Sequence, residues 1–251
     1  MESPPVSGLA DRRTYLAQVV KELQVPWPGN RHIHLVAHGH SVPAGYFATP
    51  VLQPFQAYPH LLHEGLRTWF PFAAINIIVT AMGGENSVQG VARLESQVLC
   101  HRPDVLLIDY GLNDRGVGLE AARQAWEAMI GAARERSIKV ILLTPTADLR
   151  GYGEPPGESW VQLEQHAAQI RDLAARHQVG LADSFAAFAR YTASGAPLSD
   201  LLSHVNHPSR RGHELVVGEL LPWFTSCLAA GDTGAGARSA RAGCDGLSGH
   251  P

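Results

Sequence analysis

The sequence predicts an α/β fold in which a parallel sheet of five strands is covered by helices on both faces. Five short apolar runs recur along the 251 residues, and amphipathic helical patterns lie between them. The runs are rich in leucine and β-branched residues and span about 4–7 residues, which is typical of strands buried on both faces. Strands that alternate with helices along the chain form parallel sheets. A chain of this length suits one domain of that class.

Each apolar run is assigned to one strand, in chain order. The expected strands are 32–37, 74–80, 105–109, 139–144 and 179–182. Apolar residues at helical spacing predict helices over 119–133 and 163–174. Because ligands bind beyond the carboxyl ends of the strands in such sheets, the loops after the strands are where the site is expected.

Two more helices are expected at the ends of the domain. Asp11 is a typical N-cap residue, and apolar residues at helical spacing follow it as far as Leu23. Pro208 occupies a favoured first helical position, so a last helix is expected from Pro208 to Leu221, before Pro222.

The chain is expected to form one domain over residues 1–228, with a loose start in its first ten residues. Residues 229–251 lack apolar periodicity and are rich in Gly, Ala and Ser, which predicts a disordered tail.

Composition excludes several function classes. Hydrophobic residues make up 45% and charged residues 17%, so the chain is able to form a full core. The net charge of -3 gives no electrostatic reason to expect nucleic acid or an anionic membrane as partner. No apolar run approaches the roughly 20 residues of a membrane span. The three cysteines are scattered and no secretory signal is visible, so a cytoplasmic location is expected.

Four loops supply the groups that acyl transfer requires. Glycines flank Ser41 after the first strand, and Gly83-Gly84 follows the second. Asn113 follows the third strand, and His207 precedes the last helix. Together they offer a hydroxyl, backbone N–H donors, an amide and an imidazole, which serve as nucleophile, oxyanion hole and base. One such loop alone is weak evidence, but four in this order point to catalysis.

From about Arg31 to Phe224 the chain resembles the SGNH (GDSL-type) hydrolases, a family named for Ser, Gly, Asn and His in separate blocks. Ser41 in Gly-His-Ser, Gly84, Asn113 in Gly-Leu-Asn-Asp and His207 in His-Pro match those blocks. The resemblance implies a three-layer α/β/α sandwich, flavodoxin-like, and a serine esterase that needs no metal or organic cofactor. Short acyl or carbohydrate esters are the favoured substrates, and the oligomeric state stays open.

The resemblance also implies a mechanism. His207 would accept the Ser41 proton as the serine attacks the ester carbonyl, and the oxyanion would be held by Ser41, Gly84 and Asn113. Acyl transfer to an alcohol at the same site is one alternative. A non-catalytic binding module on the same fold is another.

Two positions depart from the family pattern, because His40 and His204 stand where aspartates are usual. The absence of the second aspartate predicts a Ser41–His207 dyad, oriented by His204 or by a backbone carbonyl. Asp200 is a possible substitute acid from the same loop.

Four residues beside the blocks are candidates for substrate binding: His40, Glu85, Asn86 and Arg115. For Arg115 a salt bridge is an equally good interpretation. A metal site built from some of the 13 histidines is disfavoured, because the spacing is not that of a zinc site. The glycine-rich segment 151–157 is expected to be a mobile loop at the rim of the site.

Overall fold

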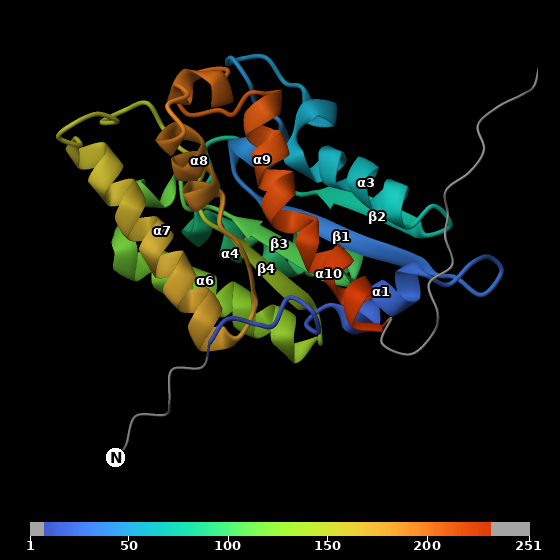
Figure 1. Ribbon diagram of the computed structural model, residues 1–251. Coiled ribbons are helices and arrows are strands. Elements are labelled where there is room, and N and C mark those ends of the chain that lie inside the picture. The colour runs from blue at the N-terminus through green and yellow to red at the C-terminus, as the bar shows by residue number, and fades with distance from the viewer. Residues whose placement is uncertain (1–7, 232–251) are drawn as a thin grey trace, which may run out of the picture.

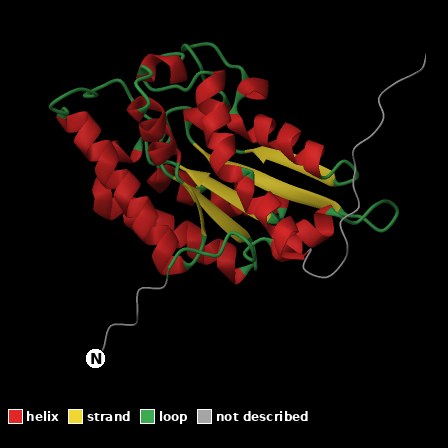
Figure 2. Ribbon diagram, viewed as in Figure 1, coloured by secondary structure: helices red, strands yellow, loops and turns green. Residues whose placement is uncertain are grey.

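The computed structural model describes residues 8–231 and contains a single five-stranded sheet in that range. The strand order is β2-β1-β3-β4-β5, and every pairing is parallel. This is the order of flavodoxin-like sheets, so the expected fold class is confirmed. Helices cover both faces of the sheet, as Figures 1 and 2 show.

All five expected strands form, with ends that shift by one or two residues. They are β1 His32–Gly39, β2 Ala74–Val79, β3 Val105–Asp109, β4 Lys139–Leu143 and β5 Gly180–Ala182. β1 is two residues longer than expected, because its register with β3 continues as far as Gly39 beside Asp109. The candidate serine therefore follows the strand after a single intervening residue.

The described residues form ten α-helices and four short 3₁₀ helices. The α-helices are α1 Ala17–Leu23, α2 Ser41–Ala44, α3 Tyr58–Trp69, α4 Ser87–Ala92, α5 Leu94–Gln97, α6 Gly118–Glu135, α7 Glu158–His177, α8 Ser184–Ala193, α9 Arg210–Leu220 and α10 Pro222–Gly231. The 3₁₀ helices are η1 Pro54–Gln56, η2 Leu99–His101, η3 Asp114–Gly116 and η4 Leu198–Leu201.

Alternate residues of the strands point into two separate cores. On one face Leu35 of β1 and Leu107 of β3 pack with α1, α3, α9 and α10. On the other face Val36 and Leu106 pack with α6 and α7. Figure 1 shows these two helical layers on either side of the strands. Burial on both faces explains why the strands have no polar alternation in the sequence.

The helices at the two ends of the chain differ in part from the expectation. The first helix starts at Ala17 rather than at Asp11, because residues 12–16 form turns. Asp11 accepts hydrogen bonds from Arg13 N and Thr14 Oγ1 in those turns. The helix expected to end before Pro222 does so, because α9 ends at Leu220. It is not the last helix, since Pro222 opens α10 at a position where proline needs no N–H group.

The start of α9 also differs from the expectation at Pro208. Ser209 is the N-cap, and its side chain accepts a hydrogen bond from Gly212 N. Pro208 lies before the helix, where it pairs with Leu202 in an isolated bridge. This bridge closes the loop that carries His207.

The expected tail begins inside a helix. α10 continues to Gly231, so the first three residues of the segment 229–251 are helical, and the rest lies outside the described residues. Residues 1–7 of the expected loose start also lie outside them. Among the helices in the described range, none has the length and apolarity needed to cross a membrane.

Candidate active site

The nucleophile candidate lies at a tight turn between β1 and α2. Gly39 ends the strand, and a Cβ atom there would lie 2.3 Å from the Asp109 carbonyl oxygen, so only glycine fits. His40 is the N-cap of α2, and its Nδ1 atom accepts a hydrogen bond from Val42 N. Ser41 is thereby held as the first residue of α2 at the carboxyl end of the sheet.

His207 reaches Ser41 from the loop before α9. Its Nε2 atom lies 3.0 Å from the Ser41 Oγ atom, within hydrogen-bonding distance. The loop is anchored by Ser203, whose hydroxyl donates to the carbonyl oxygens of His207 and Pro208. The two residues are 166 positions apart in the sequence, and the fold brings them together.

The other ring nitrogen of His207 determines which tautomer is present. Nδ1 lies 2.7 Å from the Phe47 carbonyl oxygen. A carbonyl oxygen only accepts hydrogen bonds, so Nδ1 carries the proton and donates it. The Nε2 lone pair is then free to accept the Ser41 hydroxyl proton. The arrangement fixes the tautomer that a general base requires.

Burial lowers the pKa of His207 below its ordinary value, and the Phe47 hydrogen bond opposes that shift. The electrostatic effects of His40, His204 and Arg150 lower the pKa further. A lower pKa keeps the imidazole neutral into the mildly acidic range, and the neutral form is the one that accepts a proton.

His204 does not hold the Nδ1 atom of His207 in this structure. Its side chain is exposed, and the two ring centroids lie 6.2 Å apart. Asp200, the possible substitute acid, accepts a hydrogen bond from the Tyr191 hydroxyl on α8. Of the orienting groups considered from the sequence, the geometry favours the backbone carbonyl.

The loop after β2 supplies the second group of donors. Glu85 N donates to Met82 O across a turn in which Gly84 has a φ of +80°. A turn with positive φ at its third position requires glycine or asparagine. Within the described residues, the backbone N–H groups of Ser41 and Gly84 donate to no partner, so both are open to a ligand.

Asn113 joins this loop from the end of β3. Its Nδ2 atom donates one hydrogen to the Glu85 carbonyl oxygen at 2.9 Å. The second amide hydrogen remains for a ligand. The backbone of the Gly84 loop and the Asn113 amide are therefore placed as one unit, although they come from different strands.

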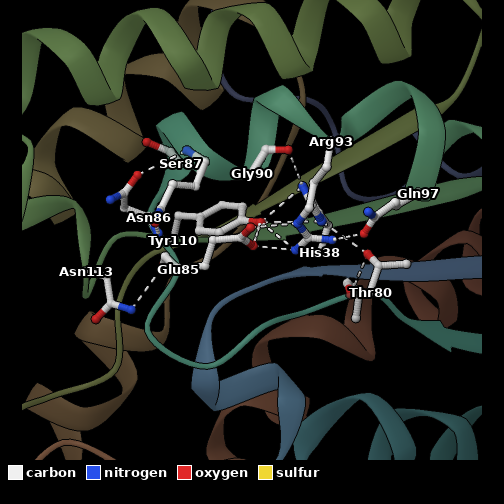
Figure 3. Close-up of polar contacts among 12 residues, drawn as sticks. His38, Thr80, Glu85, Asn86, Ser87, Gly90, Arg93, Gln97, Tyr110 and Asn113 are labelled. Carbon is white, nitrogen blue, oxygen red and sulfur yellow. Dashed lines mark hydrogen bonds and ion pairs between the residues drawn. The ribbon is translucent and has the colours of Figure 1, made fainter.

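A buried polar cluster forms around Glu85, the residue after Gly84, and Figure 3 shows its contacts. The Glu85 carboxylate forms an ion pair with Arg93, the C-cap residue of α4, and accepts a hydrogen bond from the Tyr110 hydroxyl at 2.9 Å. The same hydroxyl lies 3.1 Å from His38 Nε2, which is itself 3.2 Å from the Gly90 carbonyl oxygen. Burial lowers the pKa of His38 to about 4, so it is neutral at pH 7.

This cluster changes the interpretation of two candidate substrate-binding residues. Glu85 is directed toward Arg93 and Tyr110 rather than toward an open pocket. Asn86 is the N-cap of α4 and forms a reciprocal capping box with Gln89. Both side chains stabilise the loop that carries Gly84.

His40 is buried beneath Ser41 and pairs with a carboxylate. Its Nδ1 atom lies 3.5 Å from Ser41 Oγ, and its Nε2 atom lies 3.4 Å from Asp109 Oδ1. The latter contact is an ion-pair distance without the geometry of a regular hydrogen bond. Because Val42 N occupies the Nδ1 lone pair, the ring proton is on Nε2 and faces the carboxylate. Ser41 therefore lies between two imidazoles.

Arg115 takes part in a salt bridge, one of the two interpretations expected for it. Its Nη2 atom lies 2.6 Å from Asp148 Oδ2, and its Nη1 atom donates to Ser159 Oγ at 2.7 Å. Asp148 also contacts Arg150, so one buried carboxylate holds two guanidinium groups. No three His, Cys, Asp or Glu side chains among residues 8–231 are grouped to hold a metal ion.

Sequence reasoning missed three contributors to the site. The Phe47 carbonyl is a backbone group, so residue type carries no signal for it. Tyr46 lies in the loop after β1, and its ring centroid is 6.0 Å from that of His207. Arg150 lies in the segment after β4, where the sequence indicated only a loop. Tyr46 had one available signal, an aromatic residue five positions after the serine.

Comparison with known proteins agrees with this geometry. The family model described as GDSL-like Lipase/Acylhydrolase matches residues 37–215. No curated protein sequence matches the chain. Among solved structures, Axe2, an acetylxylan esterase from Geobacillus stearothermophilus, superposes with a TM-score of 0.67 at 20% identity, covering 76% of this chain and 94% of that chain.

A second solved structure has the same fold. LAE5, described as an alpha/beta hydrolase enzyme from the metagenome of Lake Arreo in Spain, gives a TM-score of 0.65 at 20% identity. The match covers 78% of this chain and 96% of that chain. Since the family model matches most of the chain, and the sheet is that of these neighbours, the protein belongs to the GDSL-like lipase/acylhydrolase family and is a carboxylic ester hydrolase.

Proposed function

We propose that the protein cleaves short acyl esters, carbohydrate esters among them, through an acyl-enzyme on Ser41 with His207 as the general base. The observation that carries the proposal is the 3.0 Å contact between His207 Nε2 and Ser41 Oγ. The Phe47 carbonyl supports it, since it holds the proton on Nδ1.

In the first half-reaction His207 Nε2 takes the Ser41 hydroxyl proton while Oγ bonds to the ester carbonyl carbon. The carbonyl oxygen becomes an oxyanion, which the Ser41 and Gly84 backbone N–H groups and the free Asn113 amide hydrogen stabilise. The bond to the alcohol oxygen then breaks, and His207 gives its proton to the departing alcohol.

In the second half-reaction water replaces the alcohol. His207 removes a proton from the water as its oxygen attacks the acyl-enzyme carbonyl, and the same donors hold the second oxyanion. Collapse breaks the bond to Ser41 Oγ, which regains a proton from His207, and the acid is released. An alcohol in place of the water would give acyl transfer.

The preference for a short acyl group is supported by Tyr46. Its ring lies beside His207, and a Cβ atom added to Gly83 would lie 2.9 Å from that ring. The ring therefore occupies space between the base and the oxyanion loop, where a long acyl chain would pass. The similarity in fold to an acetylxylan esterase agrees with a short acyl group.

Labelling with a serine-reactive phosphonate, followed by mass mapping, tests the nucleophile. We expect one adduct on Ser41 in the wild type and none in Ser41→Ala or in unfolded protein. His207→Ala should slow ester hydrolysis by at least about a thousandfold, as loss of a general base does in serine hydrolases. Folded protein without an adduct on Ser41 would favour the binding-module alternative.

A panel of nitrophenyl esters of rising chain length tests the acyl preference. We expect kcat/KM to be highest for acetate and to fall for longer chains. Product analysis with an added alcohol separates hydrolysis from transfer, since transfer yields a new ester in place of free acid. A maximum at long chains would contradict the role given to Tyr46.

A further inference from the structure

A pocket of about 340 Å³ lies beside the oxyanion residue Asn113. It is open to solvent and is bordered by the loop after β3, the segment after β4 and the first turns of α7. Its polar lining consists of Asn113, Arg115, Arg150, Ser159 and Gln162. Its volume is at the lower end of the range found for small-molecule sites, which suits a single ring with its substituents.

The charge of this pocket is positive. Asp148 is fully buried and contacts both Arg115 and Arg150, so two guanidinium groups share one carboxylate. The sum over these three side chains is one positive charge, which matches a ligand with one negative charge. Glu158 accepts a hydrogen bond from Gln162 but does not line the pocket.

Arg150 is the cation that faces a ligand. Arg115 is only 11% exposed and is held by Asp148, Ser159 and the Leu112 carbonyl oxygen. Arg150 is 56% exposed, and only its Nε and Nη2 atoms contact Asp148. Within the described residues its Nη1 atom donates to no partner. The guanidinium is thus fixed on one side and open on the other.

The pocket is connected to the catalytic residues at two points. Asn113 both lines the pocket and holds the Gly84 loop through the Glu85 carbonyl oxygen. The segment that carries Arg150 is bonded to the His207 loop, because Leu149 N donates to Val205 O at 2.8 Å. A group bound here would therefore lie beside the residues that hold the Gly84 loop and the His207 loop.

From this geometry we propose that the pocket binds a carboxylate on the alcohol portion of the substrate, with Arg150 as its main partner. The proposal rests on the proposed esterase activity and names its substrate class: an acyl ester of an alcohol that carries one carboxylate, such as a sugar acid. The alcohol side is chosen because Tyr46 restricts the acyl side. Ser159 and Gln162 supply polar contacts for further hydroxyl groups.

The test compares two esters of equal shape, 4-acetoxybenzoate and its neutral methyl ester, at pH 8. We expect the wild type to have a higher kcat/KM for the anionic ester than for the neutral one. In Arg150→Gln the ratio of these two kcat/KM values should fall about tenfold, which corresponds to the loss of one charge-assisted hydrogen bond. Arg150→Lys should restore part of the ratio. Arg31→Gln is the matched control, since Arg31 is 51% exposed and pairs with Asp104 at the opposite end of the sheet.

Binding without turnover separates this proposal from the esterase mechanism. In Ser41→Ala protein, calorimetry should detect 4-hydroxybenzoate, and Arg150→Gln should weaken that binding. Mono-4-nitrophenyl succinate, which carries its carboxylate on the acyl side, should show no dependence on Arg150. If Arg150→Gln still hydrolyses the neutral ester and its ratio of anionic to neutral kcat/KM is unchanged, the carboxylate site is contradicted. The proposed esterase mechanism is not contradicted by that result. Absence of turnover with both esters, despite binding in Ser41→Ala, would instead count against the mechanism.

Discussion

Ser41 has an imidazole on each side, and the two are supported differently. His207 has a carbonyl oxygen on its far nitrogen, whereas His40 has the Asp109 carboxylate. A carbonyl fixes the tautomer of the base as an acid would, but it brings no negative charge to stabilise the protonated ring. His40 is positioned by Val42 N and serves as the helix cap. The Asp109 carboxylate thus supports the turn that carries Ser41, while a backbone carbonyl supports His207.

This difference predicts the effect of restoring an acid at position 204. In His204→Asp a negative charge near His207 replaces a side chain whose electrostatic effect lowers the His207 pKa. The His207 pKa should therefore rise, and since only the neutral ring acts as base, the acidic limb of kcat/KM should move to higher pH. Activity at pH 5.5 should fall several-fold relative to activity at pH 8.

Two variants control this pH profile. His32→Asp makes the same substitution at the amino end of β1, away from the site. It should not shift the acidic limb of the pH profile of kcat/KM. His204→Ala should keep most of the activity at pH 8, because the Phe47 carbonyl still holds Nδ1. A large loss in His204→Ala would mean that His204, and not the carbonyl, orients the base.

At the scale of elements, the site depends on how the loop after β2 is supported. Its backbone is fixed by the buried ion pair of Glu85 with Arg93, and Tyr110 of the loop after β3 closes the cluster. A buried ion pair adds little net stability, but removal of one partner leaves an uncompensated charge. The cluster therefore secures one conformation of the Gly84 turn.

Gly90 of α4 gives a test of that support. A Cβ atom there would lie 2.4 Å from the Tyr110 hydroxyl oxygen, so Gly90→Ala must displace the ring. We expect a loss of about 1–3 kcal/mol in the free energy of unfolding, as for other overpacked sites, together with a lower kcat. The matched control is Gly131→Ala in α6, where nothing lies within 4 Å of the added atom.

Urea unfolding and ester turnover measure both variants. Gly131→Ala should gain about 0.5–1 kcal/mol, because alanine is the better helix former, and should keep its activity. If Gly90→Ala retained full stability and kcat, the Tyr110 contacts would have no part in positioning the Gly84 loop.

The sequence predicted the strands and the loops after them better than the contacts between loops. Strand patterns are local, and parallel strands end at one edge, so Ser41, Gly84 and Asn113 could be assigned to one site. The role of Glu85 could not be assigned, because its partners Arg93 and Tyr110 lie 8 and 25 residues away and share no motif with it. The Phe47 carbonyl has no sequence signal at all. Helices such as α3 and α8 were missed because turns and prolines interrupt the surrounding pattern.

For the molecule as a whole, the histidine side chains differ in how deeply they are buried. Of the 13, His38, His166 and His213 are buried without being part of the Ser41–His207 contact. Desolvation lowers the pKa of His38 and His166 to about 4 and that of His213 to about 3. These three remain neutral in the folded protein at a pH where an unfolded chain takes up protons on histidine. Their burial links the stability of the fold to pH.

The free energy of unfolding should therefore fall as the pH drops from about 6.5, the histidine pKa of an unfolded chain, toward 4. The sign follows from proton uptake: the unfolded state binds protons in this window that the folded state does not, so acid favours unfolding. Each pKa unit of difference corresponds to about 1.4 kcal/mol, and the three groups together should cost several kcal/mol. Urea unfolding at a series of pH values measures the slope. His166→Gln removes one of the three titrating groups from the folded and the unfolded state. The free energy of unfolding of this variant should therefore depend less steeply on pH between pH 6.5 and 4. An equal slope in the two proteins would mean that His166 takes up its proton while folded.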